Sequence, residues 1–203
     1  LNKILEILLQ DYGKSKKASK EYLLIKICST FPFRNETGTV ERISLENYQM
    51  LDDETKKERN FLVTGFKMYF SFGRYKTAGN YGLRLIEVQG DLKDKLNEYC
   101  EKYRKEGEFI FFDGCRSGAD YKDDATIESV QKKQMNNYTK YISRILETDK
   151  RLIEAGLNFK ASPNDFAKLL EKEALEMRDS HQLKKLADQR GHQVKTAIQH
   201  YAI

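Results

Sequence analysis

The first part of the chain alternates apolar and polar positions with the period of a helix. In LNKILEILLQDYGKSKKASKEYLLIKICSTFPF, residues 1–33, apolar residues recur every three or four positions on both sides of a break rich in Gly, Ser and Lys. A period near 3.6 residues places such side chains on one face of a helix, and the polar break interrupts that face. The pattern therefore predicts two helices within this segment.

Residues 60–88 follow a different pattern. In NFLVTGFKMYFSFGRYKTAGNYGLRLIEV, the residues Phe, Val, Tyr, Leu and Ile alternate or cluster, and glycine-containing turns interrupt them. Aromatic and β-branched residues between such turns favour short strands joined by hairpins. We predict a small antiparallel sheet of about three strands in this segment.

Helical periodicity returns after the predicted sheet. It covers residues 91–107, where Gly107 is a stop signal, and a short apolar element, EFIFFDG, follows at 108–114. Residues 116–124 are polar and contain glycine. The amphipathic pattern of residues 126–156 then predicts one long helix or two shorter ones.

The C-terminal part contains two signals for a helix start. Ser162 offers an N-cap hydroxyl and is followed by a proline, which suits the first helical position, and the helix is expected to run through FAKLLEKEALEM. A second start lies at Asp179 or Ser180, and Gly191 is placed to end that helix. These elements predict a single α+β domain over residues 1–203, mostly helical with one small antiparallel three-stranded sheet.

Composition adds a modest basic tendency. Lys and Arg number 36 against 31 Asp and Glu, which gives a net charge of +5 at pH 7 and a pI near 8.9. This charge favours polyanions only weakly, because many proteins that never contact DNA share it. Two Lys-rich stretches, residues 14–20 and 132–140, are the candidates for contacts with a phosphate backbone.

The cysteines and the apolar runs indicate a reduced, non-membrane environment. Cys28, Cys100 and Cys115 lack the short pair spacing of a zinc site or a redox motif. No apolar run approaches the length of a membrane span, so we expect an intracellular protein with no membrane partner. Because the chain begins at Leu1, we expect a fragment of a longer protein.

Four residues have side chains suited to an attack on a phosphodiester: Arg34, Lys76, His192 and Tyr201. A tyrosine phenol, with a pKa of about 10, needs cationic neighbours to act as a nucleophile near neutral pH. The planar fork of Arg can donate two hydrogen bonds to one phosphate. Lys or His can protonate the leaving 5′ oxygen, and no metal ion or cofactor is required.

The order of these residues resembles the catalytic domain of tyrosine recombinases, in a divergent form similar to viral or mobile-element members. In that family a Gly-His pair closes a helix and the nucleophilic Tyr lies nine residues beyond the His, as Tyr201 follows His192 in GHQVKTAIQHY. The family's catalytic lysine sits on a β-hairpin turn, and Lys76 lies in YKT between two predicted strands. Arg34, after a helix and before the sheet, takes the place of the first catalytic arginine. Residues 116–161 match nothing in the family.

One family element differs in this chain. The family opens a helix with His-x-x-Arg, and here Asn164 occupies the His position and Ala167 the second Arg position. Losing such a transition-state donor typically costs about a hundredfold or more in rate. Two explanations are open: a natural divergence for which Lys168 or Arg178 compensates, or a deliberate replacement of Arg by Ala at position 167.

The resemblance implies a site-specific DNA recombinase or integrase that acts on double-stranded DNA. Tyr201 would form a 3′-phosphotyrosyl intermediate, Arg34 and His192 would hold the phosphate oxygens, and Lys76 would protonate the leaving oxygen. The resemblance further implies no cofactor, no metal and a dimer or tetramer on DNA. It also implies an N-terminal DNA-binding domain outside residues 1–203, and a location in the bacterial cytoplasm, a nucleus or a viral factory.

Two other functions share much of this pattern. A telomere resolvase uses the same chemistry on DNA hairpin ends. A non-catalytic DNA-binding protein with a decayed recombinase fold is the alternative from another class, and Ala167 is the residue that favours it.

Each candidate residue also has an ordinary structural interpretation. Tyr201 would pack the last helix against the body, and His192 would cap a helix end. Lys76 would be a solvated turn lysine, and Arg34 would pair locally with Glu36. The four functional assignments depend on one another, because all of them come from a single alignment with the family. If that alignment is wrong, all four residues have their ordinary structural roles.

Overall fold

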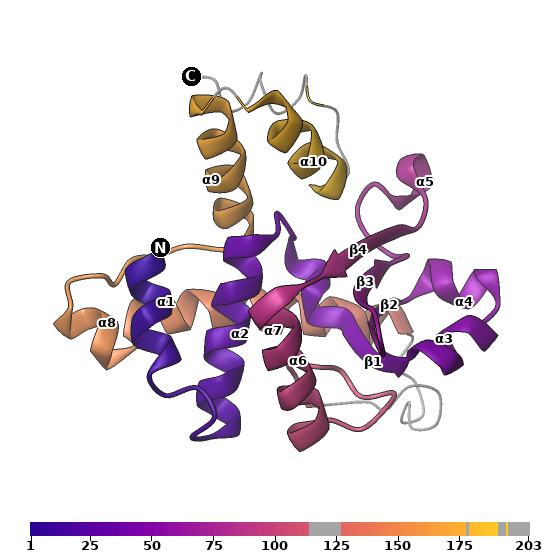
Figure 1. Cartoon of the computed structure of the whole chain (residues 1–203), viewed down its shortest axis with the longest axis horizontal. Coiled ribbons are helices and arrows are strands. Elements are labelled where there is room, and N and C mark those ends of the chain that lie inside the picture. Colours follow the sequence, from indigo (N-terminus) through magenta and orange to yellow (C-terminus); the bar gives the residue numbers. More distant parts are fainter. Residues whose placement is uncertain (114–126, 178, 191–193, 195–203) are drawn as a thin grey trace. The chain divides into compact units, whose positions relative to one another are not determined.

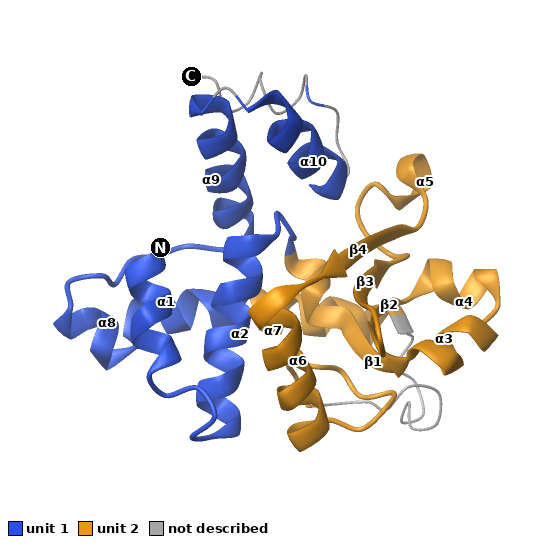
Figure 2. Cartoon of the chain, in the orientation of Figure 1, with its two compact units in different colours: residues 1–34, 140–203 blue, residues 35–139 orange. Residues whose placement is uncertain are grey.

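A computed structural model of the chain describes residues 1–113, 127–177, 179–190 and 194, which fall into two compact units (Figures 1 and 2). Unit 1 comprises residues 1–34 and 140–203, and unit 2 comprises residues 35–139. The fold class is α+β and mostly helical, as predicted. The single catalytic domain over the whole chain stays a prediction.

Unit 1 is built from helices alone in its described part. They are α1 (Asn2–Leu9), α2 (Lys16–Thr30), the end of α7 (Ile127–Thr148), α8 (Lys150–Glu154), α9 (Pro163–Glu176) and α10 (Ser180–Arg190). The two predicted N-terminal helices are confirmed as α1 and α2. Residues 126–156, predicted as one long helix or two shorter ones, form two helices, α7 and α8. Asp149 caps the start of α8 by accepting from Arg151 N at 3.0 Å.

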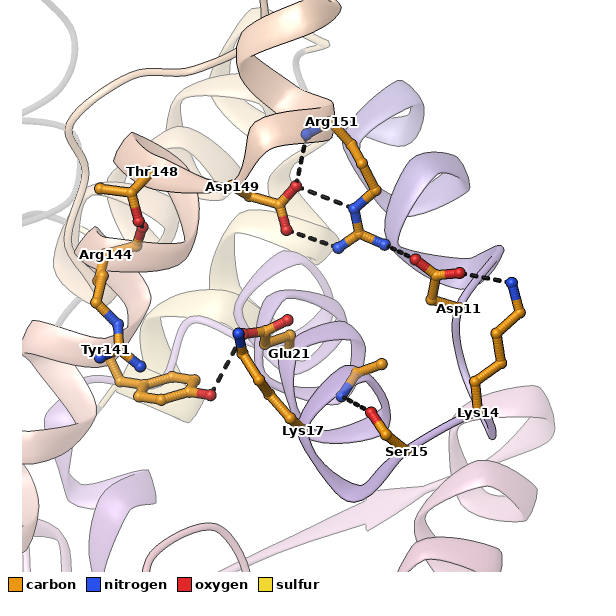
Figure 3. A network of polar contacts seen from close by, with 11 residues as sticks. Asp11, Lys14, Ser15, Lys17, Glu21, Tyr141, Arg144, Thr148, Asp149 and Arg151 are labelled. Carbon is orange, nitrogen blue, oxygen red and sulfur yellow. Dashed lines mark hydrogen bonds and ion pairs between the residues drawn. The ribbon is translucent and has the colours of Figure 1, made fainter.

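A polar network joins the helices of unit 1 (Figure 3). Arg151 donates to Asp149 through Nε at 3.0 Å and Nη2 at 2.6 Å, and it also bonds Asp11 in the turn after α1. Tyr141 in α7 donates to Glu21 Oε1 of α2 at 3.3 Å. Burial, assisted by the neighbouring Glu21 carboxylate, raises the pKa of Tyr141 to about 12. Ion pairs of Arg151 therefore connect α8 with the turn after α1, and a hydrogen bond from Tyr141 connects α7 with α2.

Unit 2 surrounds a four-stranded sheet with strand order β1-β2-β3-β4. Its elements are η1 (Asn35–Thr39), β1 (Val40–Ser44), α3 (Leu45–Met50), α4 (Asp53–Glu58), β2 (Asn60–Thr64), β3 (Met68–Phe72), α5 (Ala78–Tyr81), β4 (Arg84–Val88), α6 (Gly90–Tyr103) and the start of α7. Strands β2, β3 and β4 are antiparallel, with Leu62, Phe70 and Ile86 in register. The first strand, β1, pairs parallel to β2.

The predicted three-stranded antiparallel sheet is therefore corrected to a mixed sheet of four strands. The strand that the sequence did not indicate, β1, reads VERIS, and its charged residues break the apolar alternation. Glu41 is buried nonetheless, because Arg59 pairs with it through a two-bond contact. Arg42 extends to α6 and donates to the carbonyl oxygens of Cys100 and Arg104 at 3.0 and 2.6 Å.

Different helices pack on the two faces of the sheet. Arg42 lies on the same face as Leu62 and Phe70, so its bonds to α6 mark the face that α6 covers. On the other face Tyr48 of α3 packs edge-on against Phe61 and bonds Ser71 at 2.8 Å.

Gly38 in η1 lies where η1 and α7 approach each other closely. A Cβ at Gly38 would lie 2.6 Å from Gln134 O and 2.7 Å from Tyr138 Cβ, both in α7, so an added methyl forces the two segments apart. We expect Gly38→Ala to lower the free energy of unfolding by about 1–3 kcal/mol. Gly79→Ala is the matched control, because a Cβ there has no neighbour within 4 Å. Urea unfolding of both variants measures the difference, and equal stabilities would contradict this packing.

Candidate functional site

The predicted lysine lies on the loop between β3 and β4, residues 73–83. Lys76 is exposed there. Asn60 in β2 fixes the entry to the loop, since its side chain accepts from Arg74 N at 3.0 Å and donates to Arg74 O at 2.9 Å. Tyr75 OH donates to Gly82 O at 2.7 Å and so joins the two ends of the loop. The hairpin position predicted for Lys76 is confirmed, whereas its catalytic role stays a prediction.

A buried arginine, Arg84, packs against a residue of this loop. Its guanidinium lies 3.8 Å from the centre of the Tyr75 ring, and one of its nitrogens is 3.7 Å from Glu36 Oε1. Burial raises the pKa of Tyr75, and the positive charge of Arg84 acts in the opposite direction. Sequence reasoning missed Arg84, because an arginine inside GLRLIEV carries no spacing signal. Its position between two leucines was the only hint.

Arg34 follows α2 and precedes η1, which is the order that the resemblance requires. It is half-buried and comes directly after Phe33, whose ring stacks on Phe31 at 4.8 Å. Glu36, the partner expected under the ordinary interpretation of Arg34, pairs with Arg84. Arg34 belongs to unit 1 and Lys76 to unit 2, so their meeting at one phosphate stays a prediction.

The N-terminal end of α9 is built as the sequence predicts. Ser162 and Asp165 form a capping box with Pro163 at the first turn, and Asp165 Oδ2 accepts from Ser162 N at 2.9 Å. These bonds lower the pKa of Asp165. Asn164 and Ala167 therefore stand in the first turns of α9, at the places where the resemblance expects His and Arg.

Asn164 and Ala167 share a face of α9 with Glu171, because residues three and seven apart lie on one side of a helix. Ala167 and Glu171 are fully buried. Arg190, the last residue of α10, donates through Nη1 to Glu171 Oε2 at 2.5 Å and through Nη2 to Asn164 Oδ1 at 2.5 Å. One guanidinium thus bonds residues on both sides of Ala167.

The remaining predicted residues have different outcomes. His192 and Tyr201 lie outside the described residues, as do Arg178 and Cys115. Lys168, the other residue expected to compensate for Ala167, is exposed, and its Nζ is 4.0 Å from Asp165 Oδ1. Sequence reasoning missed Arg190 and Glu171, although Arg190 directly precedes the Gly-His pair.

The described part of the chain contains no group of three or more His, Cys, Asp or Glu residues arranged to hold a metal ion. Within the same residues, no helix is long and apolar enough to cross a membrane. Comparison of the chain with protein-family models, with curated proteins and with solved structures finds no match. The assignment of a function therefore depends on the residues themselves.

The contacts of Arg84 with the loop between β3 and β4, called the lysine loop, give a first prediction for this site. Glu36 is 6% exposed, so Arg84→Met leaves a desolvated carboxylate without its cation and removes the contact with Tyr75. We expect the free energy of unfolding to fall by about 2–4 kcal/mol. Arg74→Ala is the control, because the Arg74–Glu128 pair is exposed. Thermal and urea unfolding provide the measurement. If the free energy of unfolding falls no more in Arg84→Met than in Arg74→Ala, the buried contacts of Arg84 do not stabilise the protein.

The burial of Ala167 gives a second prediction. An arginine at this position would enter a fully buried face where Arg190 already uses the Glu171 carboxylate. We expect Ala167→Arg to lower the free energy of unfolding by about 2–4 kcal/mol, through overpacking and an unpaired buried charge. Lys168→Arg, one residue further on the exposed side, should change it by less than about 0.5 kcal/mol. A stable Ala167→Arg variant, measured by the same unfolding curves, would disprove the described packing of α9 and α10.

Proposed function

We propose that this chain is the catalytic part of a DNA strand-cleaving and rejoining enzyme of the tyrosine recombinase type. The observation that carries the proposal is the exposed Lys76 on the loop between antiparallel strands β3 and β4. A lysine that protonates a leaving oxygen must be held near the phosphate while its ammonium group stays accessible. The bonds of Arg74 to Asn60 and of Tyr75 to Gly82 restrain the loop, and the exposure of Lys76 leaves its ammonium group accessible; both features support this role.

The proposed reaction is a transfer of one phosphodiester bond. The phenol oxygen of Tyr201 bonds to phosphorus and the bond to the 5′ oxygen breaks, while the phenolic proton passes to water. Lys76 donates the proton that the 5′ oxygen takes up. Arg34 and His192 hydrogen-bond the non-bridging oxygens, where negative charge accumulates. Attack of a 5′ hydroxyl on the phosphotyrosyl bond reverses the step and rejoins the strands.

The partners of this reaction belong to the same proposal. The substrate is double-stranded DNA, bound through the basic stretches, and two or four copies of the chain assemble on it. Integration or exchange of DNA segments is the proposed outcome, and resolution of hairpin telomeres is the variant with the same chemistry. The net charge of +5 supports binding to a polyanion.

A non-catalytic DNA-binding protein is the second candidate. It is favoured by Ala167, which places no guanidinium on the first turns of α9, and by Arg190, whose guanidinium is engaged with Glu171 and Asn164. A site that lacks one of the two phosphate-binding arginines can still bind DNA phosphate, but it accelerates phosphoryl transfer less. The experiment below separates the two candidates.

Covalent trapping on DNA tests the enzyme directly. The full chain is incubated with a pool of nicked duplexes of randomised sequence, in which the cleaved end diffuses away and the adduct cannot be reversed. We expect an adduct that survives denaturing electrophoresis, and sequencing of the attached strand reports the preferred site. Tyr201→Phe should abolish the adduct, whereas Tyr81→Phe, which alters an exposed tyrosine of α5, should leave it unchanged.

Two further variants connect the adduct to the proposed site. Arg34→Ala and Lys76→Ala should each slow adduct formation by about a hundredfold while the protein stays folded. Binding of DNA that weakens with salt, without adduct in any form of the chain, would reject the enzyme and support the binding protein. An adduct that persists in Tyr201→Phe would reject the proposed nucleophile.

A further inference from the structure

Basic side chains of α2 and α7 gather around the ring of Tyr141 in unit 1. Lys20 Nζ lies 4.2 Å from the centre of this ring, and Arg144 Cζ lies 4.7 Å from it. Lys17 precedes Lys20 by one helical turn on α2 and is exposed. Lys140 precedes Arg144 by one turn on α7 and is also exposed. Because residues one turn apart share a helix face, these side chains are neighbours. We call Tyr141 and the four cations the Tyr141 patch.

Glu21 is the carboxylate of α2 that lies beside the patch. It is 8% exposed, accepts from the Tyr141 hydroxyl at 3.3 Å, and places Oε1 3.8 Å from Lys17 Nζ (Figure 3). Burial, together with the Glu21 carboxylate, raises the pKa of Tyr141 to about 12, so the phenol carries no charge near pH 7. The tyrosine therefore adds no negative charge to the patch, and its ring offers a face to cations.

The cations on α7 have no carboxylate partner within the described part of the chain. Neither Lys140 nor Arg144 forms an ion pair there, although Glu147 is exposed one turn after Arg144. Arg151, by contrast, bonds two aspartates (Figure 3). A long basic side chain that lies along an aromatic ring keeps its charged group at the surface. The Tyr141 patch thus presents more positive than negative charge to solvent.

The patch lies at the start of α2. Ser15 caps this helix by accepting from Ala18 N at 3.1 Å, which fixes the face that the following lysines share. Lys20 comes ten residues before Thr30, the last residue of α2, a distance of about 15 Å along the helix axis. Arg34, the candidate for the reacting phosphate, follows the opposite end of α2. The patch is therefore separate from the place proposed for the reaction.

We propose that the Tyr141 patch binds the phosphate backbone of duplex DNA away from the scissile phosphate. Guanidinium and ammonium groups bind phosphate through charge-assisted hydrogen bonds. Lys20 and Arg144 come from different helices, so they contact different phosphates of a backbone whose charges follow closely on one another. Contacts of this kind fix the position of the protein on the duplex and do not read its sequence. The choice of DNA as the polyanion rests on the proposed function.

The test removes two charges of the patch in Lys20→Gln combined with Arg144→Gln. The affinity of the full chain for a fluorescent duplex of mixed sequence is measured by anisotropy at several salt concentrations. The matched control is Lys102→Gln combined with Lys105→Gln, which removes the same charge from exposed positions at the end of α6. Lys102 also lies over a tyrosine ring, at 5.3 Å, but within its own helix.

We expect the plot of log affinity against log salt to become shallower by about 2 in the patch variant, because each phosphate contact contributes about 0.9 to the slope. Affinity at about 0.15 M salt should fall by about tenfold or more. The control should lose less than about threefold. Lys20→Arg combined with Arg144→Lys keeps both charges and should keep the wild-type slope.

A second variant keeps the test valid if the first one does not fold. Lys17→Gln combined with Lys140→Gln changes two exposed side chains and leaves both cations on the Tyr141 ring in place. Its slope should also become shallower by about 2. Melting curves of all variants show which of them are folded at the temperature of the binding measurements.

The possible outcomes separate this inference from the proposed function. Slopes in the folded patch variants that equal the slope of the control would overturn the inference. Binding to phosphatidylserine vesicles that is lost in these variants, with DNA binding unchanged, would overturn it in favour of a membrane surface. Covalent adduct in the wild type with unaltered slopes rejects this inference alone. Shallower slopes without any adduct in the wild type support the patch and reject the enzyme.

Discussion

A guanidinium that is removed from water needs a partner, and buried arginines connect separate elements within each unit. Arg84, Arg104 and Arg190 are each no more than 8% exposed. Arg84 pairs with Glu36 across the base of the lysine loop, and Arg190 pairs with Glu171 between α10 and α9. Arg104 donates to Ile110 O and to Asp113 Oδ1, both at 2.6 Å, and so holds the segment after α6. Since an unpaired buried charge is costly, each pair admits only a narrow set of arrangements.

Patterns within one element could be predicted from the sequence. The period of apolar residues indicated α1, α2 and α6, and the aromatic and β-branched residues indicated β2, β3 and β4. Ser162 marked the start of α9 through its capping box, and Asp179 accepts from Gln182 N at 2.8 Å at the start of α10. These features depend on residues a few positions apart, so local physics determines them.

Contacts between distant residues could not be predicted in the same way. The strand β1 was missed because Glu41 and Arg42 look solvated in sequence. In the structure Glu41 is buried against Arg59, and Arg42 donates to carbonyl groups at the end of α6. Arg84 and Arg190 were missed for the same reason. A charged residue is assigned to the surface unless its partner is known, and the partner belongs to another element. The lysine on the hairpin was found because its signal is local.

The burial of Ala167 bears on the open question of its origin. The face of α9 formed by Asn164, Ala167 and Glu171 carries one carboxylate, and Arg190 donates to its Oε2 atom. A chain with arginine at position 167 would have two guanidiniums on this face and a single buried negative charge, so one of the two would remain unpaired. With alanine at position 167, the one carboxylate on this face is matched by the one guanidinium of Arg190. This balance favours natural divergence over a deliberate replacement at position 167, because residues 171 and 190 are matched to the alanine.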